Sequence, residues 1–270
     1  MPQAIKLSII LPSYHDKYLK NTIEDILKNS GLGSSLEVIP VLDGYWRDDL
    51  PSDPRVRIVH LGANRGMRGA INAGVSVARG EFFMRLDEHC CFGNGFDKIL
   101  TDACKENEIM TATRYFLDPE KWEVMDIPPV YHERLDIVNV SEGVRKFHGK
   151  PWKERDEQQK DVPVSETMAM QGSMWIAHRE FFLKTVGELD AEHYGPLIQD
   201  SVEVTFAYWK AGGQLMLNKN TWFAHKHRSF KRTHNNGTKE NPAQYEKGYA
   251  YALQQFEVYY KQIVMPQWNL

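Results

Sequence analysis

The chain has 270 residues, and its 33 Lys and Arg nearly balance its 36 Asp and Glu, for a formal net charge of -3. Apolar residues make up 42% of the sequence. This composition indicates a globular protein and excludes collagen-like, disordered and coiled-coil chains. The near-neutral charge excludes a protein whose whole surface is basic for coating nucleic acid.

The sequence has no run of the roughly 18 apolar residues that a transmembrane helix needs. Residues 1–6 lack the basic and apolar regions of a signal peptide. The cysteines include the adjacent Cys90 and Cys91 and form no C-x-x-C motif, so neither a disulfide framework nor a zinc knuckle is expected. We therefore predict a cytoplasmic protein in which these two cysteines serve packing.

The first half of the chain alternates strand and helix signals. Short apolar runs predict strands at residues 5–11, 36–42, 56–61 and 81–86. Apolar residues at helical spacing predict a helix over 19–27 and another over 71–78, with Gly80 as the C-cap of the second. This alternation predicts an α/β fold with a mostly parallel sheet and helices on both faces.

The second half is less regular. Residues 116–165 are polar and predict an insertion with small elements of its own. Further strands are expected at 168–177, 215–217 and 222–224, and helices through Phe181, at 201–209 and at 245–260. We predict one domain that comprises a nucleotide-binding half (1–115), the insertion (116–165), an acceptor and catalytic half (166–240) and a C-terminal helix (241–270).

The triplet Asp87-Glu88-His89 directly follows the strand at 81–86. It should therefore lie at the carboxyl edge of the sheet, where open α/β sheets bind ligands. On an extended segment Asp87 and His89 point the same way, while Glu88 faces elsewhere. A carboxylate and an imidazole suit a cation such as Mn²⁺ bound to a diphosphate, although an isolated D-x-H is more often a solvated strand end.

Several short motifs accompany this triplet in a fixed order. The first strand ends in Pro12-Ser13-Tyr14, and Asn64-Arg65-Gly66, Asn72-Ala73-Gly74 and Gly80-Glu81 come before Asp87. This set resembles the family 2 nucleotide-sugar glycosyltransferases. The resemblance implies the GT-A fold, a Rossmann-like central sheet flanked by helices.

The second half is similar to the catalytic domain of polypeptide N-acetylgalactosaminyltransferases. The similarity rests on Met168 to Ser173, on Gln199-Asp200-Ser201-Val202-Glu203 and on His225. It implies that Asp87, His89 and His225 hold Mn²⁺ or Mg²⁺. Asp200 departs from that family, which has Glu at this place, so the acceptor stays open.

The resemblance also implies a set of donor-binding residues. Asp43 ends a buried strand and could accept the imino N–H of the base, although an Asp-Gly turn has the same sequence. Arg65 and Arg68 could reach a phosphate, position Asp87, or be solvated charges on a helix face. The full predicted donor set is Pro12, Tyr14, Asp43, Asn64, Arg65, Arg68, Asp87 and Gly172.

Asp200 and Glu203 lie one turn apart near a helix N-terminus and share one face of that helix. They are the predicted catalytic residues, because an acid here is the general base of inverting relatives and contacts sugar or acceptor in retaining ones. The alternative is that Asp200 caps the helix and Glu203 is a surface acid. The three tryptophans in apolar patterns are predicted core residues: Trp175, Trp209 and Trp222.

The implied enzyme is metal-dependent and moves GalNAc, GlcNAc or a hexose from a UDP-sugar. Three acceptors stay open: a saccharide, a protein hydroxyl and a hydroxylated DNA base. The segment 225–239 holds five Lys or Arg and no acid, so it could bind DNA phosphates or close over the donor diphosphate. Two rival classes are a GT-A domain that binds sugar or nucleic acid without catalysis, and a nucleotidyltransferase.

Overall fold

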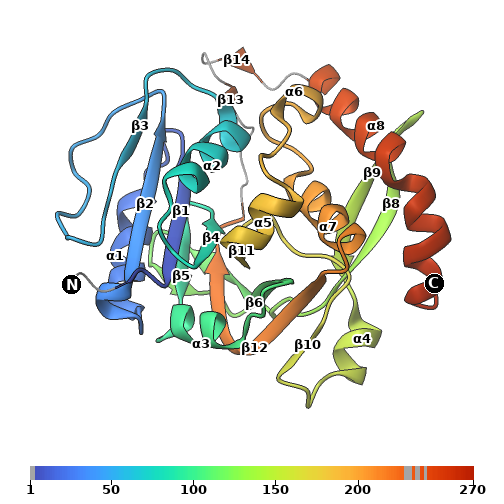
Figure 1. Ribbon diagram of the computed structural model, residues 1–270, viewed down its shortest axis with the longest axis horizontal. Coiled ribbons are helices and arrows are strands. Elements are labelled where there is room, and N and C mark those ends of the chain that lie inside the picture. The colour runs from blue at the N-terminus through green and yellow to red at the C-terminus, as the bar shows by residue number, and fades with distance from the viewer. Residues whose placement is uncertain (1–3, 228–232, 235–237, 240–241) are drawn as a thin grey trace.

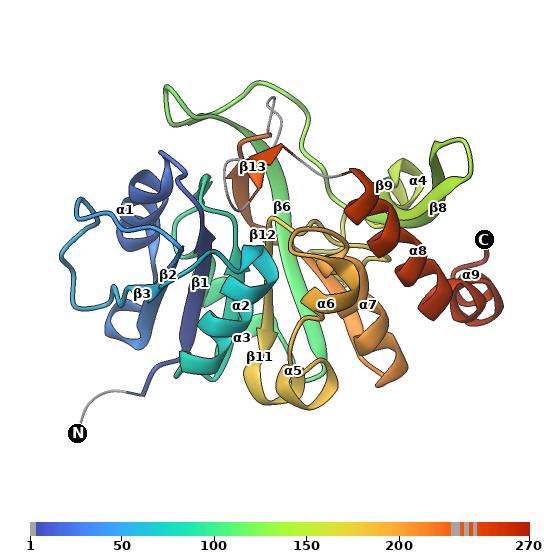
Figure 2. The ribbon, with the colours of Figure 1, turned by 90° about the horizontal axis from the view of Figure 1, so that it is seen from above.

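The structure is a computed structural model that describes residues 4–227, 233–234, 238–239 and 242–270. A large sheet crosses the molecule, and helices cover both of its faces (Figure 1, Figure 2). Its strands are β1 (Leu7–Ser13), β2 (Leu36–Asp43), β3 (Val59–Leu61), β4 (Phe82–Leu86), β5 (Cys90–Phe92), β6 (Glu108–Asp118), β7 (Glu123–Val124), β10 (Val164–Glu166), β11 (Met174–His178) and β12 (Gln214–His225). They lie in the order β10-β12-β6-β11-β4-β1-β2-β3, with β5 paired to β12 and β7 to β6.

The remaining elements surround this sheet. The helices are α1 (Leu19–Asn29), η1 (Gly33–Ser35), α2 (Gly66–Val77), α3 (Phe96–Ala103), α4 (Lys153–Gln158), α5 (Arg179–Thr185), α6 (Ala191–Tyr194), α7 (Asp200–Lys210), α8 (Pro242–Tyr259), η2 (Tyr260–Val264) and α9 (Met265–Gln267). Two small hairpins pair β8 (Glu133–Ser141) with β9 (Val144–Pro151) and β13 (Thr233–His234) with β14 (Thr238–Lys239). Across the described residues, no helix combines the length and the apolar composition that spanning a bilayer requires.

The predicted α/β fold, with helices flanking a central sheet, is confirmed, but the sheet is mixed rather than mostly parallel. β3, β2, β1 and β4 are parallel neighbours, as the alternating first half predicts. In the second half, β11 runs antiparallel to β4 and β6, whereas β12 runs parallel to β6. The carboxyl ends of β1, β2 and β4 therefore meet at one edge, where side chains that follow these strands come together.

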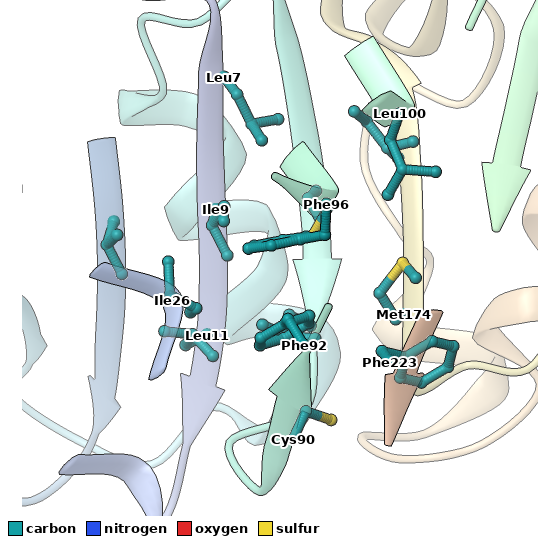
Figure 3. Close-up of a cluster of buried hydrophobic side chains, with 14 of the residues drawn as sticks. Leu7, Ile9, Leu11, Ile26, Cys90, Phe92, Phe96, Leu100, Met174 and Phe223 are labelled. Atoms are coloured by element: carbon teal, nitrogen blue, oxygen red, sulfur yellow. The ribbon is translucent and has the colours of Figure 1, made fainter. Parts of the chain in front are cut away.

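Successive residues of β1 point to opposite faces of the sheet, so their contacts show which helices cover each face. Ile9 belongs to a buried cluster with Ile26 of α1 and Leu100 of α3 (Figure 3). Ile10 belongs to a second cluster, on the other face, with Ile71 of α2. The sheet is packed from both sides, which fixes the loops at its edge.

Two predicted strands differ from the observed ones. Residues 168–177 form a strand only in β11, because the Ala169 amide donates instead to the Glu133 carbonyl at the start of β8. The strands predicted at 215–217 and 222–224 are one strand, β12, which is interrupted by a bulge. Local apolar runs cannot show that a bulge, rather than a loop, separates them.

The prediction for Gly80 was also wrong, because the C-cap of α2 is Ala78. The backbone at Gly80 instead packs closely on its neighbours, because an added Cβ would lie 2.4 Å from the Phe82 carbonyl oxygen. The predicted core tryptophan Trp175 is fully buried, as is Cys90, and Cys91 is buried. Trp209 and Trp222 are half-buried and pack against buried clusters, and Trp222 also lines a cavity.

The predicted insertion, residues 116–165, contains β7, the β8/β9 hairpin and α4. In Figure 2 the green segment after β6 arches over the sheet towards this hairpin, and α8 packs across β9. The division of the chain into two halves, an insertion and a final helix stays a prediction. In the predicted basic segment, Arg228, Lys231 and Arg232 lie outside the described residues.

Candidate active site

A cavity of about 630 Å³ lies where β1, β2 and β4 end. It is also lined by the loop before β11 and by the start of α7. The predicted site residues that line it are Pro12, Tyr14, Asp43, Asn64, Asp87, Gly172, Asp200 and His225. Within the described part of the chain, the predicted residues outside its lining are Arg65, Arg68, His89 and Glu203.

Asp87, His89 and His225 come together beside this cavity, although His225 is far from the other two in sequence. The antiparallel pairing of β5 with β12 sets Cys90 opposite His225, so the preceding residue, His89, lies next to it. The two imidazole rings are 4.9 Å apart between centroids. One ligand atom from each of the three residues lies within 4.8 Å of the others, as a shared cation would require.

The two ring nitrogens of His89 have different surroundings. Nδ1 lies 3.1 Å from Oδ2 of Asp16, a residue that the sequence analysis did not single out. Nε2 is buried, has no hydrogen-bond partner among the described residues, and lies 3.9 Å from Oδ2 of Asp87. A carboxylate that holds one nitrogen while the other stays available is the usual outer shell of a metal-binding histidine. The donor set therefore fits a divalent cation.

Arg85 sets the charge balance of the site. Its guanidinium is buried, 2.8 Å from Oδ1 of Asp87 and 3.8 Å from Oδ2 of Asp200. Burial alone would raise the pKa of Asp87, but Arg85 and the hydrogen bond from His225 hold that pKa well below its usual range. Burial lowers the pKa of His225 to about 4, against the pull of Asp87, so this imidazole is neutral at pH 7 and able to bind a metal.

The prediction that Glu88 faces away from His89 was wrong. Residues 87–89 form a bend rather than a continued strand, so the alternation of side chains does not apply. Glu88 lines the cavity, and its carboxylate lies within 4.8 Å of ligand atoms of Asp16 and His89. His89 therefore belongs to two groups of side chains that could hold a metal ion.

One side of the cavity is built around Asp43 and an aromatic cluster. Oδ1 of Asp43 accepts a hydrogen bond of 2.6 Å from the Arg65 amide, which ties the end of β2 to the start of α2. Tyr14, His15 and Tyr45 contact one another, with ring centroids 4.3 to 6.3 Å apart. The sequence analysis missed His15 and Tyr45, although Tyr45 follows the Asp43-Gly44 turn closely.

Arg68 and Glu203 occupy places that differ from the predicted ones. Arg68 is fully buried, forms an ion pair with Glu203, and donates to the Ile198 carbonyl at 2.6 and 3.2 Å. Glu203 also accepts a 3.0 Å hydrogen bond from the Asp190 amide. Arg68 is thus neither a solvated charge nor within the cavity lining, and Glu203 is not a surface acid. Both hold α2, α7 and the loop between α6 and α7 together.

Asp200 faces the cavity from the first turn of α7. The N-cap of this helix is Gln199, and Oδ2 of Asp200 is buried with no hydrogen-bond partner in the described part of the chain. An added Cβ at Gly172 would lie 3.4 Å from both carboxylate oxygens, so the glycine leaves room beside them. Asp200 is thus not the N-cap of α7, and its Oδ2 lies 3.8 Å from Nε of Arg85 without a hydrogen bond from the described residues.

Comparison with known proteins identifies relatives in one enzyme class. Residues 8–183 match the family model described as glycosyl transferase family 2. The chain is 24% identical over 231 residues to polypeptide N-acetylgalactosaminyltransferase 12 of Mus musculus, across 78% of this chain and 38% of that protein. It is 32% identical over 113 residues to the glycosyltransferase GlyG of Streptococcus pneumoniae, across 39% of this chain and 33% of that protein.

A solved structure is also similar. The crystal structure of GalNAc-T7 with UDP, GalNAc and Mn²⁺ has a TM-score of 0.74 and 15% identity, over 96% of this chain and 50% of that chain. This likeness concerns the fold alone, which is GT-A. The chain spans about a third to a half of the length of these relatives. Because the family model covers most of the chain, the protein belongs to glycosyl transferase family 2.

Proposed function

We propose that the protein transfers a sugar from a UDP-sugar to an acceptor hydroxyl, with Mn²⁺ or Mg²⁺ held by Asp87, His89 and His225. The observation that carries this proposal is the convergence of one carboxylate and two imidazoles beside a large cavity, each imidazole with a buried nitrogen that has no hydrogen-bond partner among the described residues. The similar structure of GalNAc-T7 was solved with UDP, GalNAc and Mn²⁺, which supports a UDP-sugar donor and a divalent cation.

Transfer from a nucleoside diphosphate creates negative charge on the departing diphosphate, and a bound divalent cation stabilises that charge as a Lewis acid. The protein's own residues prepare the site. Arg85 keeps Asp87 ionised, and Asp16 orients the His89 ring so that Nε2 faces Asp87. This preorganisation reduces the rearrangement that donor binding requires.

We assign the base and ribose of the donor to the far side of the cavity. Asp43 lies at the end of β2 and lines the cavity, beside Asn64 and Tyr14. Asp43 is almost fully buried, and burial raises its pKa against two backbone hydrogen bonds. A buried acceptor here suits the imino N–H of uracil, and the rings of Tyr14 and His15, which line the cavity, supply apolar contact.

Asp200 is the proposed catalytic carboxylate. As a general base it would take the proton of the acceptor hydroxyl in an inverting reaction, and in a retaining reaction it would contact sugar or acceptor. The acceptor is a saccharide, a protein hydroxyl or a hydroxylated DNA base. Of the basic segment, Lys226 is described, with its amine over the Tyr18 ring at 4.8 Å. The DNA option therefore rests on the sequence alone.

The test is release of UDP from a panel of UDP-sugars, measured with Mn²⁺ and with EDTA, and with saccharides, peptides or hydroxymethylated DNA as acceptors. We expect release that requires Mn²⁺ and increases with one acceptor class. Asp87→Asn should lose at least about 100-fold in activity, because it removes a charged ligand without changing the side-chain volume. Equal release in EDTA would refute metal dependence, and formation of UTP and a sugar 1-phosphate when pyrophosphate is added to a UDP-sugar would instead indicate a nucleotidyltransferase.

A further inference from the structure

A second cavity, of about 580 Å³, shares no lining residue with the active-site cavity. It lies between β6, the bulge of β12, the segment before β8, and α4. We propose that this cavity is a saccharide-binding site for an uncharged pyranose ring. The proposal concerns binding only and does not depend on the proposed catalytic function.

The strand register puts the two cavities on opposite faces of β12. Trp222 is paired with Thr113 and His225 with Phe116, and side chains alternate along each strand. Trp222 and His225 are three residues apart, so they point to opposite faces, His225 into the active site and Trp222 into the second cavity. A ligand in one cavity therefore does not overlap a ligand in the other.

Three aromatic side chains form one wall of the second cavity. The antiparallel bridge of Arg114 and Val130 sets Tyr131 beside Thr113, on the same face as Trp222. Tyr115, two residues further along β6, meets Trp222 at a ring-centroid distance of 5.7 Å and an angle of 80°. Half-buried aromatic rings of this kind offer flat apolar faces to the C–H groups of a pyranose.

The polar groups of the cavity favour an uncharged ligand. Lys219 donates to the Gln159 and Lys160 carbonyls at 2.5 and 2.9 Å, and Lys160 pairs with Glu157 at 2.8 Å. Asp156 lies 2.8 Å from Nδ1 of His132. With Lys153, the lining holds three lysines against two acids, so its net charge is small and gives little attraction to an ion.

One buried polar group is left over for a ligand. Thr221 lines the cavity and is 4% exposed, and its Oγ1 has no hydrogen-bond partner among the described residues. An unpaired buried hydroxyl is costly, and a sugar hydroxyl would satisfy it. An apolar wall with a few inward polar groups is the usual character of a small-molecule site.

Saturation-transfer-difference NMR on the intact chain tests this proposal, with the methyl glycosides of glucose, galactose, GlcNAc and GalNAc as probes. We expect signals from the ring protons of at least one glycoside, with a dissociation constant of about 1 mM for a ligand of this size. Tyr131→Ala should weaken binding about 10-fold, whereas Tyr131→Phe keeps the ring and should stay within about 3-fold of wild type. Thr221→Val should weaken binding about 3- to 10-fold, the contribution of one hydrogen bond.

The matched control is Trp46→Ala, which removes a ring that is 62% exposed and lines neither cavity. It should leave glycoside binding unchanged, and thermal melting of each variant should confirm an intact fold. The proposal is overturned if no glycoside gives a signal at about 20 mM, far above the expected dissociation constant. It is equally overturned if Tyr131→Ala and Thr221→Val bind as wild type does, or if UDP with Mn²⁺ or inorganic phosphate displaces the glycoside.

Discussion

The His89 ring is oriented by Asp16, a residue outside the motif Asp87-Glu88-His89. Its Nδ1 meets Asp16, and its Nε2, which has no hydrogen-bond partner in the described ranges, faces Asp87. Arg85 in turn fixes the charge of Asp87 and lies close to Asp200. At the scale of the residue, the proposed metal site thus depends on Asp16 and Arg85 as much as on the three side chains that would bind the ion.

Removing an imidazole from this group should weaken metal binding. His225→Ala takes away a neutral ligand that β12 holds beside His89, so we expect Mn²⁺ affinity to fall by more than about 100-fold. Isothermal titration calorimetry with Mn²⁺ measures this directly. His148→Ala, at an exposed position on β9, is the control and should bind as wild type does. Unchanged affinity in His225→Ala would remove this residue from the site.

Asp16 should act through His89. Asp16→Asn keeps an oxygen to accept the 2.7 Å hydrogen bond from the Tyr18 amide but loses the charge that faces Nδ1. We expect Mn²⁺ affinity to fall about 10- to 100-fold, as for other residues that orient a metal-binding histidine. The control is Asp49→Asn, an exposed acid paired with Arg47. Equal affinity in Asp16→Asn and wild type would contradict the orienting role.

Sequence patterns and structure agree best where a short motif follows a strand. Asp43 and Asp87 could be placed at the sheet edge because each directly follows an apolar run. Asp16 could not be linked to His89, because the contact depends on a loop in which His15 takes a φ of 56°. Arg85 could have been identified from the sequence, because it is a charged residue within the otherwise apolar strand β4.

At the scale of elements, α2 and α7 are joined by a buried ion pair. Arg68 of α2 reaches Glu203 of α7 and the Ile198 carbonyl, and its guanidinium lies over the Tyr194 ring at 4.5 Å. This contact fixes the start of α7, where Asp200 lies. The helical spacing of Asp200 and Glu203 predicts their shared turn, but not that α2 supplies the partner of Glu203.

Breaking this pair should destabilise the fold. Arg68→Met leaves the Glu203 carboxylate largely buried without its cation, so we expect a loss of about 3–5 kcal/mol in the free energy of unfolding. The double variant Arg68→Met/Glu203→Leu removes both charges and should recover part of that loss. Urea denaturation of the single and double variants completes the cycle. A single variant that loses less than about 1 kcal/mol would show that the pair behaves as an exposed one.

The loop between α6 and α7 also packs closely on the start of α2. Gly66 has a φ of 77°, and an added Cβ would lie 2.3 Å from Cβ of Pro196. Gly66→Ala should therefore cost about 1–2 kcal/mol for the backbone conformation and about 1–3 kcal/mol more for the overlap. Gly143 has a similar φ of 74°, but an added Cβ there would have no atom within 4 Å. Gly143→Ala should therefore show only the loss that comes from the backbone conformation. Equal losses in both variants would contradict close packing at Gly66.

At the scale of the whole molecule, one sheet separates the two cavities. The residues that line the active-site cavity come from distant parts of the chain. The family model matches residues 8–183, whereas Asp200 and His225 lie beyond that match. Both residues reach the cavity because α7 and β12 fold back against β4 and β5. The apolar runs of the first half predict its parallel strands, but the mixed second half depends on long-range pairing that local patterns do not encode.

The most direct test of the proposed metal site is anomalous diffraction at the manganese edge from crystals grown with Mn²⁺ and UDP. We predict one peak in the active-site cavity, within about 2.5 Å of a carboxylate oxygen of Asp87 and of one nitrogen each from His89 and His225. The side chains of Asp16, Glu88 and His89 form the competing group. A peak between those three residues, or no peak beside Asp87, would contradict the account.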